Sequence, residues 1–507
     1  MSISRLSTEL DLKVASFVES TEDLIALSQA SKYYQGIGEQ TLYPRINVAR
    51  TNWVGLHRLL LTLIKRPGLA LLIKHIDMRS ESFDTPDDVV STSDSDEKVR
   101  NLKKETWDNI SVIRDRIDQV MQYAPQDDVT TRIKHSILSA LLHCSKLARD
   151  STDALIICVA KNLETLSVCQ ASEMTQAVLT LPWTMEEDRP FGKVKEILVC
   201  SCGSHCPLPL AVLPTTQCLT IQHWQSEWTL TTHSKSIKQP VRFPVSKPEK
   251  PLLRILRLEG IMLEPAYVTR TIQSPWCAEL QSLEVSNVYP THRNTLGSNS
   301  HGAGDMPTLL QSLEKHTPKL EKLVWTYRFR IPTEDEKIKS FRGLKCLKDL
   351  EITCDVVTDM ETFETTLASL RNIMPDGLEA LTFGNVPLAG IEGFVTEYFS
   401  NPKVLAEGTV HQESAQAIKY LAAAIPGKRL LLRIVLEQAN DDESDGIELL
   451  EMSLDTIWTL RFVVDELMKL GLTLEIFREV GLYEAKPKLL IGPGFTAPTP
   501  HSVRPSV

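Results

Sequence analysis

The stretch Cys200-Ser-Cys202-Gly-Ser-His205-Cys206 holds the residues of this chain that are best suited to binding a metal ion. A structural zinc site takes four thiolate or imidazole ligands, commonly as two separated pairs. Cys200 directly follows a segment with the pattern of a strand, and no matching second pair follows along the chain. We therefore interpret the stretch as a loop after a strand and keep a zinc site as the alternative.

No other motif in the sequence predicts chemistry. The chain lacks a G-x-S-x-G elbow, an H-E-x-x-H pair, a Gly-Lys-Ser/Thr phosphate loop and a G-x-G-x-x-G turn. Its 12 histidines are scattered, with His135 and His143 in helical patterns and His223 just after a strand-like one. We expect no catalytic residue, no metal and no cofactor, and hence no enzyme. An enzyme on an α/β scaffold remains an alternative that would need a pocket with converging polar groups.

A repeated pattern, with apolar residues at its first, fourth and sixth positions, organises most of the chain. It begins at Leu163, Val194, Thr216, Leu253, Leu280, Leu320, Leu347 and Leu378, with weaker matches at Leu431 and Leu472. Alternation along a strand turns the apolar residues inward and the residues between them to the other face of the sheet. Stacked repeats of this kind bury a continuous core and line a concave surface.

The pattern resembles the strand segment of a leucine-rich repeat. It departs from that family where a regular repeat has Asn or Cys, since Ala171, Asp355 or Val386 stands there. The resemblance implies an irregular solenoid, a curved parallel sheet with outer helices. Unrelated strands of an α/β domain are the alternative. The outward positions expected to contact a protein substrate, or merely to keep the sheet soluble, are Thr165, Ser167, Glu196, Thr220, Gln222, Arg257, Glu259, Glu284, Lys322 and Glu351.

The first 48 residues predict three short helices. Apolar residues recur at helical spacing from Leu6 to Val18, and Thr21-Glu22-Asp23 has the chemistry of a new helix start. A third segment runs from Ser31 to Leu42. About 40 residues of short helix bury little surface alone, so we expect them to lean on a partner or on the rest of the chain.

These residues resemble an F-box, the module that attaches a substrate receptor to a Skp-family adaptor of a cullin–RING ubiquitin ligase. The match runs through Leu6, Glu9-Leu10, Val14, Phe17-Val18, Asp23-Leu24, Leu27, Ser28, Ser31-Lys32-Tyr33 and Leu42-Tyr43. The family usually begins with Leu-Pro, whereas this chain has Leu6-Ser7. The resemblance implies that Leu6, Leu10, Val14, Val18, Leu24 and Leu27 fill the adaptor groove, with Glu9, Lys32 and Tyr33 at its margin.

The chain between residues 49 and 160 is expected to link this module to the repeats. After Leu42-Tyr43, the order strand, helix, Pro67 and strand resembles the entry into the repeats of fungal leucine-rich F-box proteins. Clustered acids and few apolar groups predict a disordered loop over residues 80–105, and apolar stripes predict helices from 106 to 161. The repeats then occupy 161–483, and the Pro-rich tail, 484–507, is expected to be disordered.

Composition limits the class of protein. With 507 residues, 42% of them hydrophobic, the chain has ample material for a core. A net charge of −10 gives no electrostatic support for nucleic-acid binding. No apolar run approaches the about 18 residues of a membrane span, and no secretion signal is evident. The 10 cysteines show no disulfide framework. We expect an intracellular protein of the cytoplasm or nucleus, with no membrane contact.

Together these patterns predict an α/β protein in which an F-box-like helical module precedes an irregular leucine-rich solenoid. By resemblance, it recruits a protein substrate to a cullin–RING ubiquitin ligase through a Skp-family adaptor. The alternative is a leucine-rich scaffold without a ligase role, whose N-terminal helices merely cap the solenoid.

Overall fold

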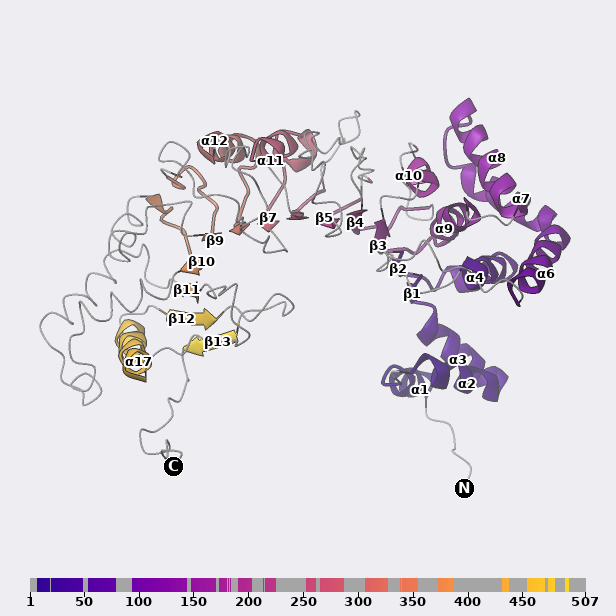
Figure 1. Ribbon diagram of the computed structural model, residues 1–507, viewed down its shortest axis with the longest axis horizontal. Helices are drawn as coiled ribbons and strands as arrows, with labels where there is room; N and C mark the ends of the chain where they lie inside the picture. Colours follow the sequence, from indigo (N-terminus) through magenta and orange to yellow (C-terminus); the bar gives the residue numbers. More distant parts are fainter. Residues whose placement is uncertain are drawn as a thin grey trace, which may run out of the picture. The chain divides into compact units, whose positions relative to one another are not determined.

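The computed structural model describes more of the N-terminal half of the chain than of the C-terminal half, which it describes mainly at its strands and a few helices (Figure 1). The residues it describes are 7–18, 20–48, 53–78, 94–143, 147–169, 173–179, 181, 183, 190–202, 213, 215–224, 252–260, 265–286, 306–326, 338, 340–353, 373–386, 431–436, 454–469, 473–478 and 488–491. Internal contacts divide the chain into two compact units, Met1–Leu253 and Arg254–Val507. The boundary falls inside the range expected for the repeats.

The first unit opens with a module of three helices, α1 (Thr8–Ala15), α2 (Thr21–Ala30) and α3 (Lys32–Leu42). Serine side chains cap two of them. The Ser20 hydroxyl accepts a hydrogen bond from the Asp23 amide, and the Ser31 hydroxyl accepts one from the Tyr34 amide, each at 3.2 Å. The helix start predicted at Thr21 is confirmed. The module has a small core of its own, built on Ala15, Leu24 and Ile37.

Parallel strands follow one another in chain order through the rest of this unit. They are β1 (Arg45–Asn47), β2 (His75–Asp77), β3 (Thr165–Cys169), β4 (Glu196–Cys202) and β5 (Cys218–Trp224). Helix α4 (Trp53–Lys65) lies between β1 and β2 in the chain, and Pro67 begins the short α5 (Pro67–Ala70). The predicted order strand, helix, Pro, strand is therefore confirmed.

Further helices of the first unit are described after β2 in the chain, and Figure 1 shows them as purple ribbons. They are α6 (Asp94–Asp108), α7 (Ile110–Met121), α8 (Asp128–His143), α9 (Leu147–Val159) and α10 (Glu173–Leu179). The prediction of disorder over 80–105 is wrong from Asp94 onward. Leu102 is 1% exposed and Thr106 is fully buried, so packing stabilises a helix whose sequence is polar. Residues 79–93 lie outside the described part.

The second unit repeats the parallel arrangement. Its strands are β6 (Ile255–Gly260), β7 (Ser282–Ser286), β8 (Lys322–Thr326), β9 (Asp349–Thr353), β10 (Ala380–Val386), β11 (Leu431–Leu436) and β12 (Thr473–Arg478). Its helical elements are α11 (Pro265–Ile272), the 3-10 turn η2 (Pro275–Cys277), α12 (Met306–His316) and α17 (Leu454–Lys469). Figure 1 shows α11 and α12 on the same side of the strands.

The register of these strands confirms the phase of the repeat. The fourth-position leucines, from Leu256 through Leu283, Leu323 and Leu350 to Leu381, are paired strand to strand and at most 2% exposed. In the first unit the residues that pair at this position are likewise apolar and buried: Leu166, Ile197 and Leu219. Each unit is thus an α/β arrangement of parallel strands over a continuous apolar row, as stacking repeats require.

The C-terminal expectation needs one correction. Lys488–Ile491 forms the strand β13, which pairs antiparallel with β12, although disorder was predicted from residue 484. The Leu-Leu-Ile run is apolar and suits an edge strand of the sheet. Residues 225–251, 287–305 and 492–507 lie outside the described residues. No helix among those that the structure describes is both long and apolar enough to cross a membrane.

Candidate functional site

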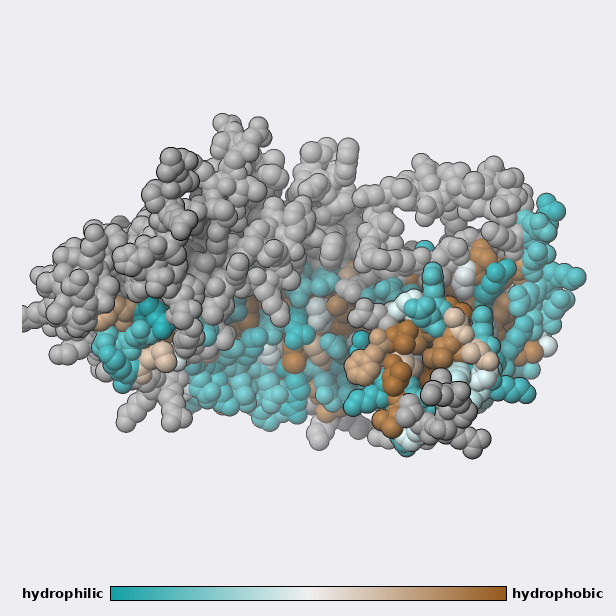
Figure 2. Space-filling view, turned by 90° about the horizontal axis from the view of Figure 1, so that it is seen from below, coloured by the Kyte–Doolittle hydropathy of each residue, from teal (hydrophilic) through white to brown (hydrophobic). Residues whose placement is uncertain are grey.

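The three-helix module exposes large apolar side chains along one side of α1 and in the turn that follows it. Leu10, Val14 and Phe17, spaced four and three residues apart, are 48%, 58% and 74% exposed. Ile25 of α2 and Tyr33 of α3 are also exposed, at 43% and 46%. We call these five residues the docking face. Figure 2 shows the brown of apolar residues gathering over the N-terminal helices.

The opposite side of α1 serves the core of the module. Ala15 is 1% exposed and packs with Leu24 and Ile37. Partly buried apolar residues complete this core: Leu12, Val18, Leu27, Tyr34 and Leu42. Helix α1 is therefore apolar on two sides, and only one of them is used inside the module.

The structure divides the residues that were predicted to fill an adaptor groove. Leu10 and Val14 are exposed and available for contact. Leu24 is 6% exposed in the core, with Val18 and Leu27 packed against it, so these three side chains hold the module together. Their contact with an adaptor groove stays a prediction, and each has only its remaining exposed surface to offer a partner. Leu6 lies outside the described residues.

The predicted margin residues are placed on the surface. Glu9 and Lys32 are exposed. The Tyr33 hydroxyl donates a hydrogen bond of 2.6 Å to the Asp11 carboxylate, which raises the pKa of Tyr33. The Tyr33 ring meets the Tyr34 ring edge to face, with centroids 5.2 Å apart. Tyr33 therefore joins α1 to α3 at the rim of the docking face.

Two residues of the docking face, Phe17 and Ile25, were not predicted as contacts. Phe17 continues the series of Leu10 and Val14 at helical spacing, and that spacing was the signal that could have identified it. Ile25 follows the buried Leu24 directly, so only the packing of α2 on its neighbours decides which of the two faces outward.

The second predicted surface, the outward side of the strands, is polar and half-buried. Ser167 and Thr220 are buried, at 8% and 5% exposure. The other predicted positions are intermediate in exposure: Thr165, Glu196, Gln222, Arg257, Glu259, Glu284, Lys322 and Glu351. Adjacent strands bring several of them side by side, including Thr165 with Glu196 and Arg257 with Glu284.

A chain of charges runs across β6, β7 and β8 on this side. The Glu284 carboxylate accepts hydrogen bonds from Arg257 at 2.8 Å and from Lys322 at 3.1 Å. Burial alone would raise the pKa of Glu284, but these two cationic partners outweigh it and the net direction is downward. The outward charges therefore pair with one another and keep the sheet face ordered.

The cysteine-rich stretch shows no metal geometry in its described portion. The Cys200 thiol is buried and donates to the Gln222 side-chain oxygen at 3.4 Å. Residues 203–210 lie outside the described part. Within the described ranges, no group of three or more His, Cys, Asp or Glu side chains is arranged to hold a metal ion.

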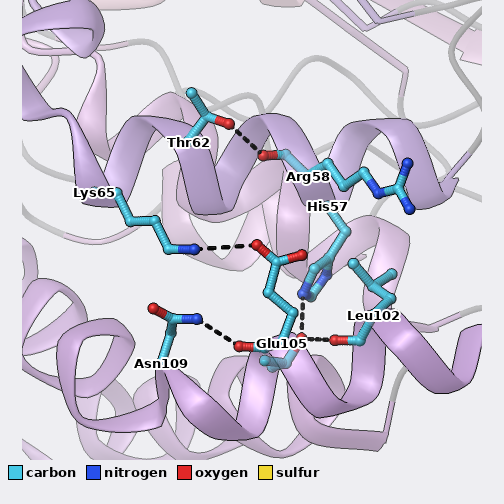
Figure 3. A network of polar contacts seen from close by, with 8 residues as sticks. His57, Arg58, Thr62, Lys65, Leu102, Glu105 and Asn109 are labelled. Atoms are coloured by element: carbon cyan, nitrogen blue, oxygen red, sulfur yellow. Dashed lines mark hydrogen bonds and ion pairs between the residues drawn. The ribbon is translucent and has the colours of Figure 1, made fainter.

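A buried polar network joins α4 to α6 (Figure 3). The Thr106 hydroxyl donates to the Leu102 carbonyl at 2.8 Å, so it accepts the hydrogen bond from His57 Nε2 at 2.9 Å. Burial lowers the pKa of His57 to about 4, although nearby Glu105 opposes the shift. Lys65 donates to the Glu105 carboxylate at 3.1 Å. The His57–Thr106–Leu102 part of this network is buried between the helices, whereas the Lys65–Glu105 pair is exposed.

The sequence was compared with protein-family models and with curated proteins. No family model matches the sequence, and no curated protein is significantly similar to it.

Proposed function

We propose that the protein is the substrate-recognition subunit of a cullin–RING ubiquitin ligase, which binds a Skp-family adaptor through its N-terminal helices. One observation carries this proposal: a helical module with a complete core of its own still exposes Leu10, Val14 and Phe17 on one side. A cluster of large apolar groups costs free energy in water, and a partner that covers it removes that cost. The sequence resemblance to an F-box identifies the kind of partner.

The repeats support the other half of the proposal. Parallel strands in chain order present a row of polar side chains that includes Arg257, Glu284 and Glu351. A polar surface of hydroxyls and charges of both signs suits a protein segment. The protein would perform no chemistry itself. It would raise the effective concentration of a bound substrate next to the ubiquitin-conjugating enzyme.

Binding of the full-length protein to a purified Skp-family adaptor, measured by titration calorimetry, tests the proposal. We expect Phe17→Asp and Val14→Asp each to weaken binding by at least about 30-fold, because each places a charge in the centre of an apolar contact. Leu24→Asp is unsuitable as a test, since Leu24 lies in the core and its substitution would unfold the module.

Val129→Asp is the matched control, because Val129 is an equally exposed apolar residue, at 56%, on α8 outside the module. This variant should bind like the wild type. If the wild-type protein does not bind the adaptor, the ligase function is rejected and the scaffold alternative takes its place. Equal loss in Phe17→Asp and Val129→Asp would place the contact away from the docking face.

A further inference from the structure

The three-helix module contacts the turn between α4 and α5 through an ion pair with two parallel hydrogen bonds. The two terminal nitrogens of the Arg66 guanidinium donate to the two carboxylate oxygens of Glu39, each at 2.8 Å. Gln35, one turn earlier on α3, donates to the same carboxylate at 2.9 Å. This fork geometry fixes the relative orientation of both side chains as well as their distance.

Both residues of the pair lie on backbone segments that hydrogen bonds hold in place. Glu39 belongs to the last turns of α3, and its side chain is only 16% exposed. Arg66 stands between two helices: its amide donates to the Thr62 carbonyl at the end of α4, and its carbonyl accepts from the Leu69 amide of α5. Pro67 begins α5 and restricts the backbone further. Because both backbones are fixed, the geometry of the ion pair restricts how the three-helix module is oriented on the α4–α5 turn.

An open cavity lies beside the pair, so side-chain packing contributes little to holding the module and the α4–α5 turn together at this point. An open cavity of about 430 Å³ lies between α3 and the α5 region. Its lining residues are Gly36, Glu39, Gln40, Arg66, Gly68, Leu69 and Leu72. A β-carbon added at Gly36 or at Gly68 would meet no atom within 4 Å. The module core and the α4–α5 core are therefore not fused at this point.

The covalent link supplies the second attachment. Only Tyr43 and Pro44 separate α3 from β1, and the Pro44 carbonyl accepts hydrogen bonds from the amides of Lys74 and His75. The short Tyr43–Pro44 link would allow the module to rotate, and the Glu39–Arg66 ion pair would restrict that rotation. We propose that the Glu39–Arg66 pair is a positioning device that holds the helical module at a single orientation on the repeats.

Its consequence for the ligase rests on the proposed function: an adaptor bound to the docking face would be held at a defined angle to the substrate-binding strands. The pair lies outside the docking face, so breaking it should leave adaptor affinity unchanged. Ubiquitin transfer to a bound lysine would fall, because transfer depends on the geometry between the two bound partners.

Double electron–electron resonance on the full chain tests the orientation without any partner. Spin labels are attached through azide-bearing amino acids placed at Gln29 on α2 and at His135 on α8, both exposed. We expect one narrow distance distribution for the wild type and a broader one for Arg66→Gln. The wild type should also broaden in 1 M salt, where the screening length falls to about 3 Å.

Two further variants give the test its controls. The charge-reversed pair, Glu39→Arg with Arg66→Glu, should restore the narrow distribution and so exclude simple misfolding. Lys65→Gln, which removes the neighbouring ion pair to Glu105 at 3.1 Å, should leave it unchanged. A narrow wild-type-like distribution in Arg66→Gln would overturn the inference. Because no adaptor is present, that result is independent of whether the protein belongs to a ligase.

Discussion

Gly38 of α3 lies so close to Ser28 of α2 that a β-carbon added at Gly38 would stand 2.8 Å from the Ser28 β-carbon. The same atom would be 3.2 Å from the Leu24 carbonyl oxygen. Both neighbours belong to the backbone or to its first side-chain atom and cannot swing away. We expect Gly38→Ala to separate α2 from α3 at a cost of about 1–3 kcal/mol. Faster hydrogen exchange of the α2 and α3 amides would report this loss.

Gly36, one half-turn earlier on the same helix, provides the control. A β-carbon there meets nothing within 4 Å, so Gly36→Ala should slow exchange and stabilise the helix by about 0.5–1 kcal/mol. If both alanine variants slow exchange alike, the close contact between α2 and α3 is wrong.

His57 should make the first unit sensitive to acid. Its folded pKa is lowered from 6.5 to about 4, chiefly by burial. Between these values the unfolded chain binds a proton that the folded chain does not, so stability falls as the pH drops from about 6.5 to about 4. The loss from this one group should reach about 3 kcal/mol. Because buried Asp153 has the opposite pH dependence over the same range, urea midpoints at pH 4.5 and pH 7.5 show the loss as a difference between the wild type and a variant without the imidazole.

Substitution separates this histidine from the others. His57→Gln keeps a donor for Thr106 but cannot take up a proton, so its urea midpoint should rise relative to that of the wild type as the pH drops from 7.5 to 4.5. His135→Gln, which removes an exposed histidine and leaves His57 in place, is the matched control. Identical pH profiles for wild type and His57→Gln would contradict the assignment.

The buried carboxyl group of Asp153 on α9 should make the protein less stable as the pH rises, opposite to the effect of His57. It is 8% exposed, and within the described residues its Oδ1 has no hydrogen-bond partner. Burial raises its pKa from 3.8 to about 7, against a smaller opposing effect of Arg149. The folded state therefore favours the protonated acid, and stability is lost as the pH rises from about 4 through about 7.

Asp153→Asn should then stabilise the protein at pH 8 by up to about 4 kcal/mol and give no gain at pH 4. Urea unfolding at both pH values measures this. Asp150, one turn away, accepts hydrogen bonds from the amides of Met174 and Thr175 at the start of α10. Asp150→Ala should instead cost about 1 kcal/mol at pH 8, as loss of a helix cap does. An Asp153→Asn variant that is destabilised at pH 8 would rule out a strained carboxylate.

The strands could be predicted from the sequence because their apolar residues alternate in one phase. The leucines at 256, 283 and 323 mark the inward row without any knowledge of the neighbours. Helix α6 could not be predicted, since its polar sequence is stabilised by burial of Leu102 and Thr106. The hydrogen bond between Thr106 and His57 joins residues 49 positions apart in the chain, and such a contact leaves no local periodic signal in the sequence.

The docking face could be predicted only in part for a related reason. Helix α1 carries apolar residues on two sides, one through Leu10 and Val14 and the other through Leu12 and Ala15. Helical periodicity identifies a stripe but does not say which of two stripes packs against α2 and α3. Tertiary packing decides, and it places Leu24 inside and Phe17 outside.

Neighbouring residues of β7 give a direct test of the strand faces. Leu283 is fully buried in the inward row, so Leu283→Ala should cost about 2–5 kcal/mol through lost contacts and a cavity. Glu284 points to the other side of the sheet. The side chain of Glu284 is 21% exposed, that of Arg257 33% and that of Lys322 39%. Screening by water limits the cost of Glu284→Gln to about 1 kcal/mol. Urea midpoints of the two variants measure the contrast, and equal losses would mean that β7 does not separate a buried face from a solvated one.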